Sequence, residues 1–172
     1  EADVIVLVGS EAGATWGFAR ALKAGLTKAG YRVHCAEMNA LAHSYPRAGM
    51  LFVLTSTYGD GDAPGSAGRF MDRLRDFRAG SALGFGDRQF PNFCRFALEV
   101  DEALAGKGLS RIQPVELIDR CSAARFSEWG DRLGTAIGAQ LSLSHDPVPP
   151  RTFRLELAGR VDYGLAVQAP TS

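Results

Sequence analysis

Short apolar runs alternate along this chain with stretches in which apolar residues recur at helical spacing. Residues 4–8 and 50–54 are continuous apolar runs, which is the pattern of strands buried on both faces of a parallel sheet. Between them, Phe18 and Leu22 belong to a helical stripe, and Gly30 offers that helix a place to end. Strands that alternate with helices form βαβ units, so this pattern predicts a parallel sheet covered by helices on both faces.

The rest of the chain continues the alternation. We expect a weaker strand over 31–37, a short helix capped by Asn39, and strands over 81–85 and 112–118. Pro114 has no backbone N–H, so the last strand should lie at the sheet edge. Three further apolar stripes predict helices over 70–77, 93–104 and 129–141. The sequence therefore predicts an α/β fold with a doubly wound five-stranded parallel sheet in the order 2-1-3-4-5.

Composition excludes several classes of function. The 172 residues suffice for one core, and 19 basic residues balance 19 acidic residues. The arginines are scattered rather than clustered, so we expect no nucleic-acid partner. No apolar run approaches the roughly 20 residues of a membrane span, and no signal peptide is recognisable. We expect a cytoplasmic domain without membrane contact, with room for a membrane anchor elsewhere in a parent chain.

Cysteine and histidine suggest no chemistry of their own. Cys35, Cys94 and Cys121 are odd in number and widely spaced, which argues against a disulfide framework and against a metal site. We expect free thiols in a reducing compartment. The three histidines fall in no motif, so we assign them structural or surface roles.

The composition of the chain changes near its carboxyl end. Residues 144–150 contain three prolines and should form a stiff, extended linker. Residues 152–157 alternate like a strand, but the last 22 residues or so are too few for a domain. We expect residues 1–143 to form one domain, and residues 144–172 to be a linker and the start of the next domain. The chain begins at Glu1 rather than Met, which suggests a domain cut from a longer protein.

The first chemically informative segment is the loop 9–15, between the first strand and its helix. Backbone N–H groups and the helix dipole make such a loop an anion site, most often for phosphate. Gly13 would let the backbone approach a ligand closely. The loop has neither the G-x-G-x-x-G pattern nor the lysine of a P-loop, so an ordinary strand-to-helix turn is the alternative.

Two more loops should leave the same edge of the sheet, after the third and fourth strands. Loop 55–64 carries Tyr58 beside glycines, and an aromatic face there suits a planar ligand. Loop 83–93 carries glycines, a polar cluster and Phe90. Phe90 would either form the opposite wall of a ligand site or pack in the core beneath its loop.

Together the three loops resemble the FMN-binding domains of diflavin reductases, a family that includes the sulfite reductase flavoprotein and NADPH-cytochrome reductase. Residues 10–15 are similar to its S-x-T-G-T-[AT] loop, and residues 57–62 to its T-Y-G-[ED]-G-[DE] loop. Residues 84–93 are similar to its G-L-G-[ND]-x-x-[YF]-x-x-F stretch. The resemblance covers residues 4–142 and implies a flavodoxin-like fold with bound FMN. Residues 151–172 resemble the first strands of the FAD-binding reductase domain.

The resemblance implies a role for individual residues. The first loop would hold the FMN phosphate, and the other two would enclose the ring, with Tyr58 and Phe90 stacked on opposite faces. Asp119 matches an acidic residue of the family near the ribityl chain. The implied site comprises Ser10, Glu11, Ala12, Gly13, Ala14, Thr15, Ser56, Thr57, Tyr58, Gly59, Asp60, Gly61, Gly86, Asp87, Arg88, Gln89, Phe90, Asn92, Phe93 and Asp119.

The chain departs from the family pattern at Ala12 and Ala14, where the family often has threonine. Two hydroxyls are therefore missing, and each is worth about 1.5–3 kcal/mol when its partner is charged. Backbone amides and the helix dipole remain. One alternative is accordingly a flavodoxin-fold interaction module with weak or lost FMN binding.

The resemblance also implies a function. NADPH and FAD, held by reductase domains of the same parent chain, would supply electrons that this domain passes through FMN to a haem or other one-electron acceptor protein. No catalytic side chain and no metal are needed, because the cofactor carries the chemistry. Asp60, Asp62 and Asp87 would steer a cationic acceptor, or they are simply solvated loop charges. A phosphoacceptor receiver domain shares the strand order, but here the first strand ends in Gly-Ser rather than in clustered acids.

Overall fold

The computed structural model describes residues 1–40, 48–57, 59–70 and 79–148. These residues build a parallel sheet in the order β2-β1-β3-β4-β5, with β6 also paired to β4. This order confirms the predicted doubly wound α/β fold. The strands are β1 (Val4–Gly9), β2 (Val33–Glu37), β3 (Met50–Ser56), β4 (Ala79–Gly86), β5 (Ser110–Arg111) and β6 (Glu116–Asp119).

The predicted fifth strand is broken into two short pieces. β5 and β6 both pair with β4, but four residues (112–115) separate them where β4 has only two (81–82). The N–H of Ile112 still donates to the carbonyl of Gly80 at 3.0 Å. Pro114, two residues later, has no backbone N–H and cannot donate a hydrogen bond to β4. The prediction of a continuous strand over 112–118 was therefore wrong.

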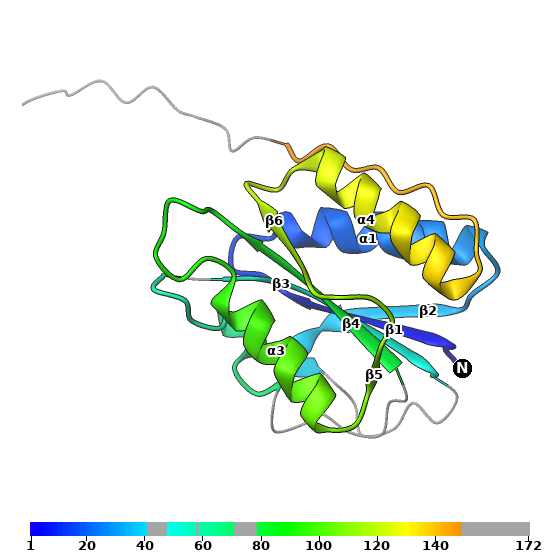
Figure 1. Cartoon of the computed structure of the whole chain (residues 1–172), viewed down its shortest axis with the longest axis horizontal. Coiled ribbons are helices and arrows are strands. Elements are labelled where there is room, and N and C mark those ends of the chain that lie inside the picture. The colour runs from blue at the N-terminus through cyan, green and yellow to red at the C-terminus, as the bar shows by residue number, and fades with distance from the viewer. Residues whose placement is uncertain (41–47, 58, 71–78, 149–172) are drawn as a thin grey trace, which may run out of the picture.

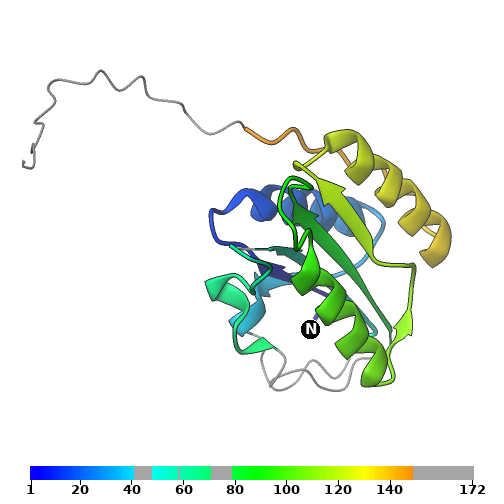
Figure 2. The same cartoon turned by 60° about the vertical axis from the view of Figure 1, so that its left-hand side comes forward.

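Helices cover both faces of the sheet (Figure 1, Figure 2). α1 (Ala14–Lys28) and α4 (Ala123–Ile137) pack on one face, and α3 (Arg95–Gly106) packs on the other. Alternate residues of β1 serve the two cores: Val6 and Val8 face α1 and α4, while Ile5 and Leu7 face α3. All four are fully buried, as expected for a central parallel strand.

The helices predicted after Asn39 and over 70–77 are only partly covered by the described residues. The helix expected after Asn39 is a 3-10 turn, η1 (Met38–Ala40), with Asn39 inside it rather than at its cap, and its expected end lies outside the described residues. Of the helix predicted over 70–77, only Phe70 is described, and its ring is fully buried. A second 3-10 turn, η2 (Gly65–Ala67), precedes it.

The last helix ends earlier than its apolar stripe suggested. Gly138 adopts a left-handed φ of 67°, which closes α4 after Ile137. Leu141 is buried as predicted, but from an extended segment, residues 139–148, which we call the strap. Among the described helices, none is both long and apolar enough to cross a bilayer.

Candidate functional site

The first strand-to-helix loop forms one wall of a cavity of about 320 Å³ at the carboxyl ends of the strands. In a doubly wound sheet this edge, beside the switch point between β1 and β3, is where ligands bind. Three predicted loop segments contribute to the cavity, which we call the loop cavity. It is lined by Ser10, Glu11, Ala12, Ala14, Thr15, Ser56, Thr57, Phe85, Gly86 and Cys121.

The loop leaves the amino end of α1 open. Gly13 is the N-cap, with φ 83° and no side-chain cap, and the first turn holds no acidic residue. The Ser10 hydroxyl accepts the N–H of Gly13 at 2.9 Å. The N–H groups of Ala12 and Ala14 have no partner among the described residues. Free donors at a helix amino end attract anionic groups such as phosphate.

Bonds across the sheet edge tie this loop to η2. The Ser66 hydroxyl accepts the N–H of Ser10 at 3.0 Å and donates to the Ser10 carbonyl at 3.2 Å. The Glu11 carboxylate accepts the N–H of Gly65 at 2.9 Å. Glu11 thus lines the cavity while its charge is partly satisfied by a neighbouring backbone group.

A second, smaller cavity of about 30 Å³ adjoins the first. Thr57 and Gly86 line both, which places the two side by side. Phe90 stands on the wall of the smaller cavity with 61% of its surface exposed, so the alternative that it packs in the core is excluded. The remaining lining residues are Gly59, Asp87, Asn92, Phe93 and Cys94.

Several predicted site residues also brace the loops through hydrogen bonds. Asn92 Nδ2 donates to the carbonyl of Asp60 at 2.7 Å, and the Cβ of Asn92 packs close to Gly61. The Asp87 carboxylate accepts the N–H of Gln89 at 2.8 Å.

Asp119, at the end of β6, holds the third loop with one more hydrogen bond. The Asp119 carboxylate accepts the N–H of Arg88 at 3.0 Å, while the Arg88 guanidinium lies over the ring of Phe93. Asp119 is therefore engaged with the loop itself. Tyr58, the predicted stacking residue, lies outside the described residues.

Sequence reasoning missed two residues of the loop cavity, Phe85 and Cys121. Phe85 was placed at the end of the fourth strand and at the start of loop 83–93, but it was not chosen as a site residue. Cys121 follows β6 by two residues, and that position was itself a usable signal, because loops after parallel strands gather at one edge. Burial raises the pKa of the Cys121 thiol, and it raises that of Cys94, beside the smaller cavity, to about 12.

The polar groups of the two cavities fit a phosphorylated, planar ligand. Thr57 Oγ1 is buried at the junction of the cavities and has no hydrogen-bond partner among the residues that the structure describes. A buried hydroxyl without a partner costs free energy, so a ligand atom there would be stabilised. The uncapped helix end suits a phosphate, and the exposed ring of Phe90 suits an aromatic ligand. The Glu11 carboxylate repels a phosphate, and Ala12 and Ala14 offer it no hydroxyl, but the backbone donors remain in place.

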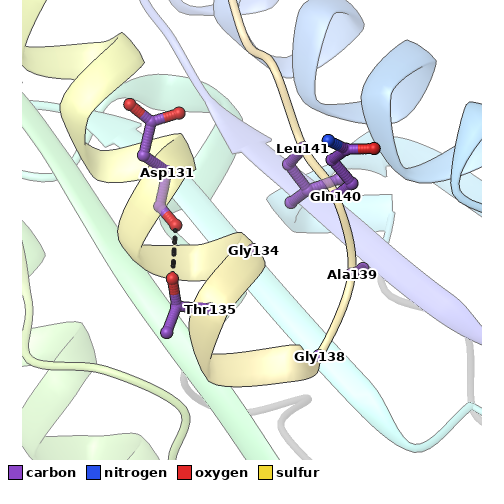
Figure 3. Close-up of a pocket in the computed structure, with 7 residues that line it drawn as sticks. All are labelled: Asp131, Gly134, Thr135, Gly138, Ala139, Gln140 and Leu141. Atoms are coloured by element: carbon purple, nitrogen blue, oxygen red, sulfur yellow. Dashed lines mark hydrogen bonds between the residues drawn. The ribbon is translucent and has the colours of Figure 1, made fainter.

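A larger hollow, of about 480 Å³, lies away from these loops, between the end of α4 and the strap (Figure 3). The Thr135 hydroxyl there donates to the backbone carbonyl of Asp131 at 3.2 Å. Ala139 packs directly against the helix end, because its carbonyl oxygen lies 2.7 Å from where a Cβ on Gly134 would stand. Within the described part of the chain, no group of His, Cys, Asp and Glu side chains could hold a metal ion.

Fold and site together define a doubly wound α/β protein with a mononucleotide-type pocket at the switch point of its sheet. Comparison with known families agrees: the flavodoxin family model matches residues 6–129. The chain belongs to the flavodoxin family.

The curated relatives include larger oxidoreductases. The sulfite reductase [NADPH] flavoprotein alpha-component of Bacillus subtilis is 31% identical over 121 residues, which is 65% of this chain and 20% of that protein. The inducible nitric oxide synthase of Bos taurus is 31% identical over 107 residues, 57% of this chain and 9% of that protein. The chain thus spans a fifth or less of these relatives. The predicted resemblance to diflavin reductases is confirmed.

Solved structures confirm the fold. A flavodoxin of Streptococcus pneumoniae TIGR4 matches with a TM-score of 0.66 at 22% identity, covering 78% of this chain and 94% of that one. Flavodoxin 2 of Bacillus cereus matches with a TM-score of 0.65 at 22% identity, covering 79% and 96%.

Proposed function

We propose that this domain binds FMN and carries electrons from a reductase partner to a one-electron acceptor. The observation that carries the proposal is the pair of adjoining cavities, which join an open helix end to an exposed aromatic ring. A phosphate needs the first feature and an isoalloxazine ring the second. Membership of the flavodoxin family supports the same ligand.

Different residues of the two cavities would bind different parts of FMN. The N–H groups of the first loop would hold the phosphate, with Ser10 and Thr15 as the hydroxyls on that wall. Thr57 would bond the ligand between the cavities, and Phe90 would cover one face of the ring and exclude water. Bound FMN would supply both one-electron and two-electron redox chemistry. Stacking of Tyr58 on the other face stays a prediction from the sequence.

The wider electron path is part of this proposal. The sulfite reductase [NADPH] flavoprotein, of which this chain spans a fifth, supports a parent chain that also uses NADPH. The FAD site of that parent chain stays a prediction from the family resemblance. The acceptor would be a haem or other one-electron protein, and the domain would work in the cytoplasm, or on the cytoplasmic side of a membrane if its parent is anchored. Asp87 lies 3.5 Å from the Arg120 guanidinium, so Asp60 and Asp62 would contribute most of any field that steers a cationic acceptor.

The alternative is an interaction module of the same fold that no longer binds FMN. The observation that favours it is the composition of the phosphate wall, where Glu11 adds a negative charge and Ala12 and Ala14 offer no hydroxyl. On this alternative, the loop cavity would show no preference for a phosphorylated flavin.

Alkylation of the free cysteines tests the proposal on the protein itself. Cys121 lines the loop cavity, whereas Cys35 lies on β2, is also half-buried and also has a burial-raised pKa, which makes it an internal control. Because both thiols are largely protonated at neutral pH, iodoacetamide labelling is best done near pH 9. FMN should slow the labelling of Cys121 and leave that of Cys35 unchanged, as measured by peptide mass spectrometry.

A direct titration accompanies the labelling. FMN fluorescence should be quenched with a saturable one-site curve. No saturation at ~100 μM FMN, an affinity of only about −5.5 kcal/mol, together with equal labelling of Cys121 with and without FMN, would favour the interaction module.

A further inference from the structure

The strap runs back from the end of α4 along the face of α1 and α4 (Figure 1, Figure 2). Its side chains alternate: Leu141 and Leu143 are buried, while Ser142 and Ser144 are exposed. Such alternation is the pattern of an extended chain lying on a core. Further along the strap, the His145 ring lies against the ring of Phe18 in α1.

Glycines of α1 and α4 leave the space in which the strap packs. A Cβ on Gly25 of α1 would lie 2.5 Å from Leu143 Cδ2, and one on Gly130 of α4 would lie 2.7 Å from Leu143 Cγ. A Cβ on Gly17 would lie 2.1 Å from His145 Nε2. Real Cβ atoms do not approach other atoms so closely, so a methyl group at any of these three positions would displace the side chain of Leu143 or His145.

His145 packs on the part of α1 that builds the loop cavity. Its ring meets Phe18 edge to face with centroids 4.6 Å apart. Phe18 in turn lies 4.6 Å from the ring of Phe85, which lines the cavity. Gly17 follows Thr15, another lining residue, by two positions in the first turns of the same helix. One route of ring contacts and one short stretch of helix thus join the strap to the cavity wall.

We infer that His145 is a positioning residue for the flavin site, and that docking of the strap and binding of the ligand are coupled. His145 holds Phe18, and through it Phe85, in the position that shapes the cavity. The inference rests on the proposed binding of FMN. Coupling between two sites is reciprocal, so bound FMN must strengthen docking of the strap by the same factor by which the docked strap strengthens FMN binding.

Three variants of the 172-residue chain test the coupling by FMN titration. His145→Ala removes the ring, and Gly17→Ala displaces it; each should raise the Kd for FMN about fivefold, at the low end of coupling between two sites. In the double variant the Cβ at position 17 meets no ring, so the double variant should bind FMN no more weakly than His145→Ala alone. Ser144→Ala, at an exposed neighbour, is the matched control and should bind like the wild type.

Two further measurements separate positioning from a merely structural role. The visible absorption band of bound FMN should differ in His145→Ala from that of the wild type and of Ser144→Ala. Amide hydrogen exchange over 141–146 should slow when FMN is added to the wild type, and should not respond in His145→Ala.

The outcomes distinguish this inference from the proposed function. If the wild type binds FMN and His145→Ala binds it with the same Kd and the same spectrum, the coupling is wrong and the proposed function stands. Additive losses in the double variant would also overturn the coupling, because the two changes would then act separately. If the wild type does not bind FMN, the proposed function fails and this inference fails with it.

Discussion

Ala12 and Ala14 stand on the phosphate wall of the loop cavity, where the resembled family often carries threonine. Their neighbours still offer backbone N–H groups and an uncapped helix end. A hydroxyl at each position would add one hydrogen bond to a charged partner, worth about 1.5 kcal/mol at the low end. The two bonds together are worth about 3 kcal/mol, so we predict that the Ala12→Thr, Ala14→Thr double variant binds FMN on the order of 100-fold more tightly. Fluorescence titration measures the change.

Riboflavin provides the control for this prediction, because it shares the ring and lacks the phosphate. Its affinity should be the same in the wild type and in the double variant. Equal gains for both flavins would show that the first loop faces the ring rather than the phosphate. No gain for either would place the two side chains away from the ligand altogether.

Individual residues of the site were predictable from the sequence to the extent that their role depends on chain position. The loop after a parallel strand must lie at the ligand edge, so position indicated the three loops, and the family resemblance then implied Ser10, Thr57 and Gly86 within them. The bond from Glu11 to Gly65 joins residues 54 positions apart. It depends on how two loops lie against each other, and no local pattern encodes that. Cys121 was overlooked because its residue type, rather than its position after β6, was considered.

At the scale of elements, strand identity was predictable from apolar runs, and element ends were not. The stripe that includes Leu141 continues the period of α4, but Gly138 ends the helix and Leu141 is buried from the strap instead. Helical and extended chains can both bring an apolar residue to the same core, so a stripe alone does not decide between them. The break between β5 and β6 likewise follows from Pro114, which the sequence located at the sheet edge without showing the interruption.

The strap is the element whose contribution to stability is easiest to isolate. Leu143 is 1% exposed and fits against Gly25 and Gly130, so Leu143→Ala leaves a cavity that the glycines cannot fill. We predict a loss of about 2–5 kcal/mol in the free energy of unfolding, measured by urea denaturation. Val148→Ala is the control, since Val148 is 87% exposed and its truncation should change stability by less than about 0.5 kcal/mol. A loss of similar size in both variants would contradict a docked strap.

At the scale of the whole molecule, the sheet separates two cores, and the strap belongs to only one of them. Leu141 and Leu143 join the core on the α1 and α4 face, together with Phe18 and Trp129. The sequence placed the end of this domain at residue 143, next to a proline-rich linker. The contact of His145 with Phe18 carries packing two residues further. A stretch rich in proline is stiff but can still dock on a surface, and composition does not reveal whether a groove exists to receive it.

Two truncations test where the folded unit ends. Removing residues 151–172 deletes the segment expected to belong to a following domain, and the melting temperature should change by less than about 2 °C. Removing residues 139–172 deletes two buried leucines as well. Each leucine is worth about 2–5 kcal/mol, and 1 kcal/mol shifts the melting temperature of a protein this size by roughly 2–4 °C. The shorter chain should therefore melt at least about 8 °C lower, by calorimetry or circular dichroism. A drop of several degrees in the first truncation would mean that residues 151–172 pack on this domain, and an unchanged second truncation would mean that the strap contributes nothing to its core.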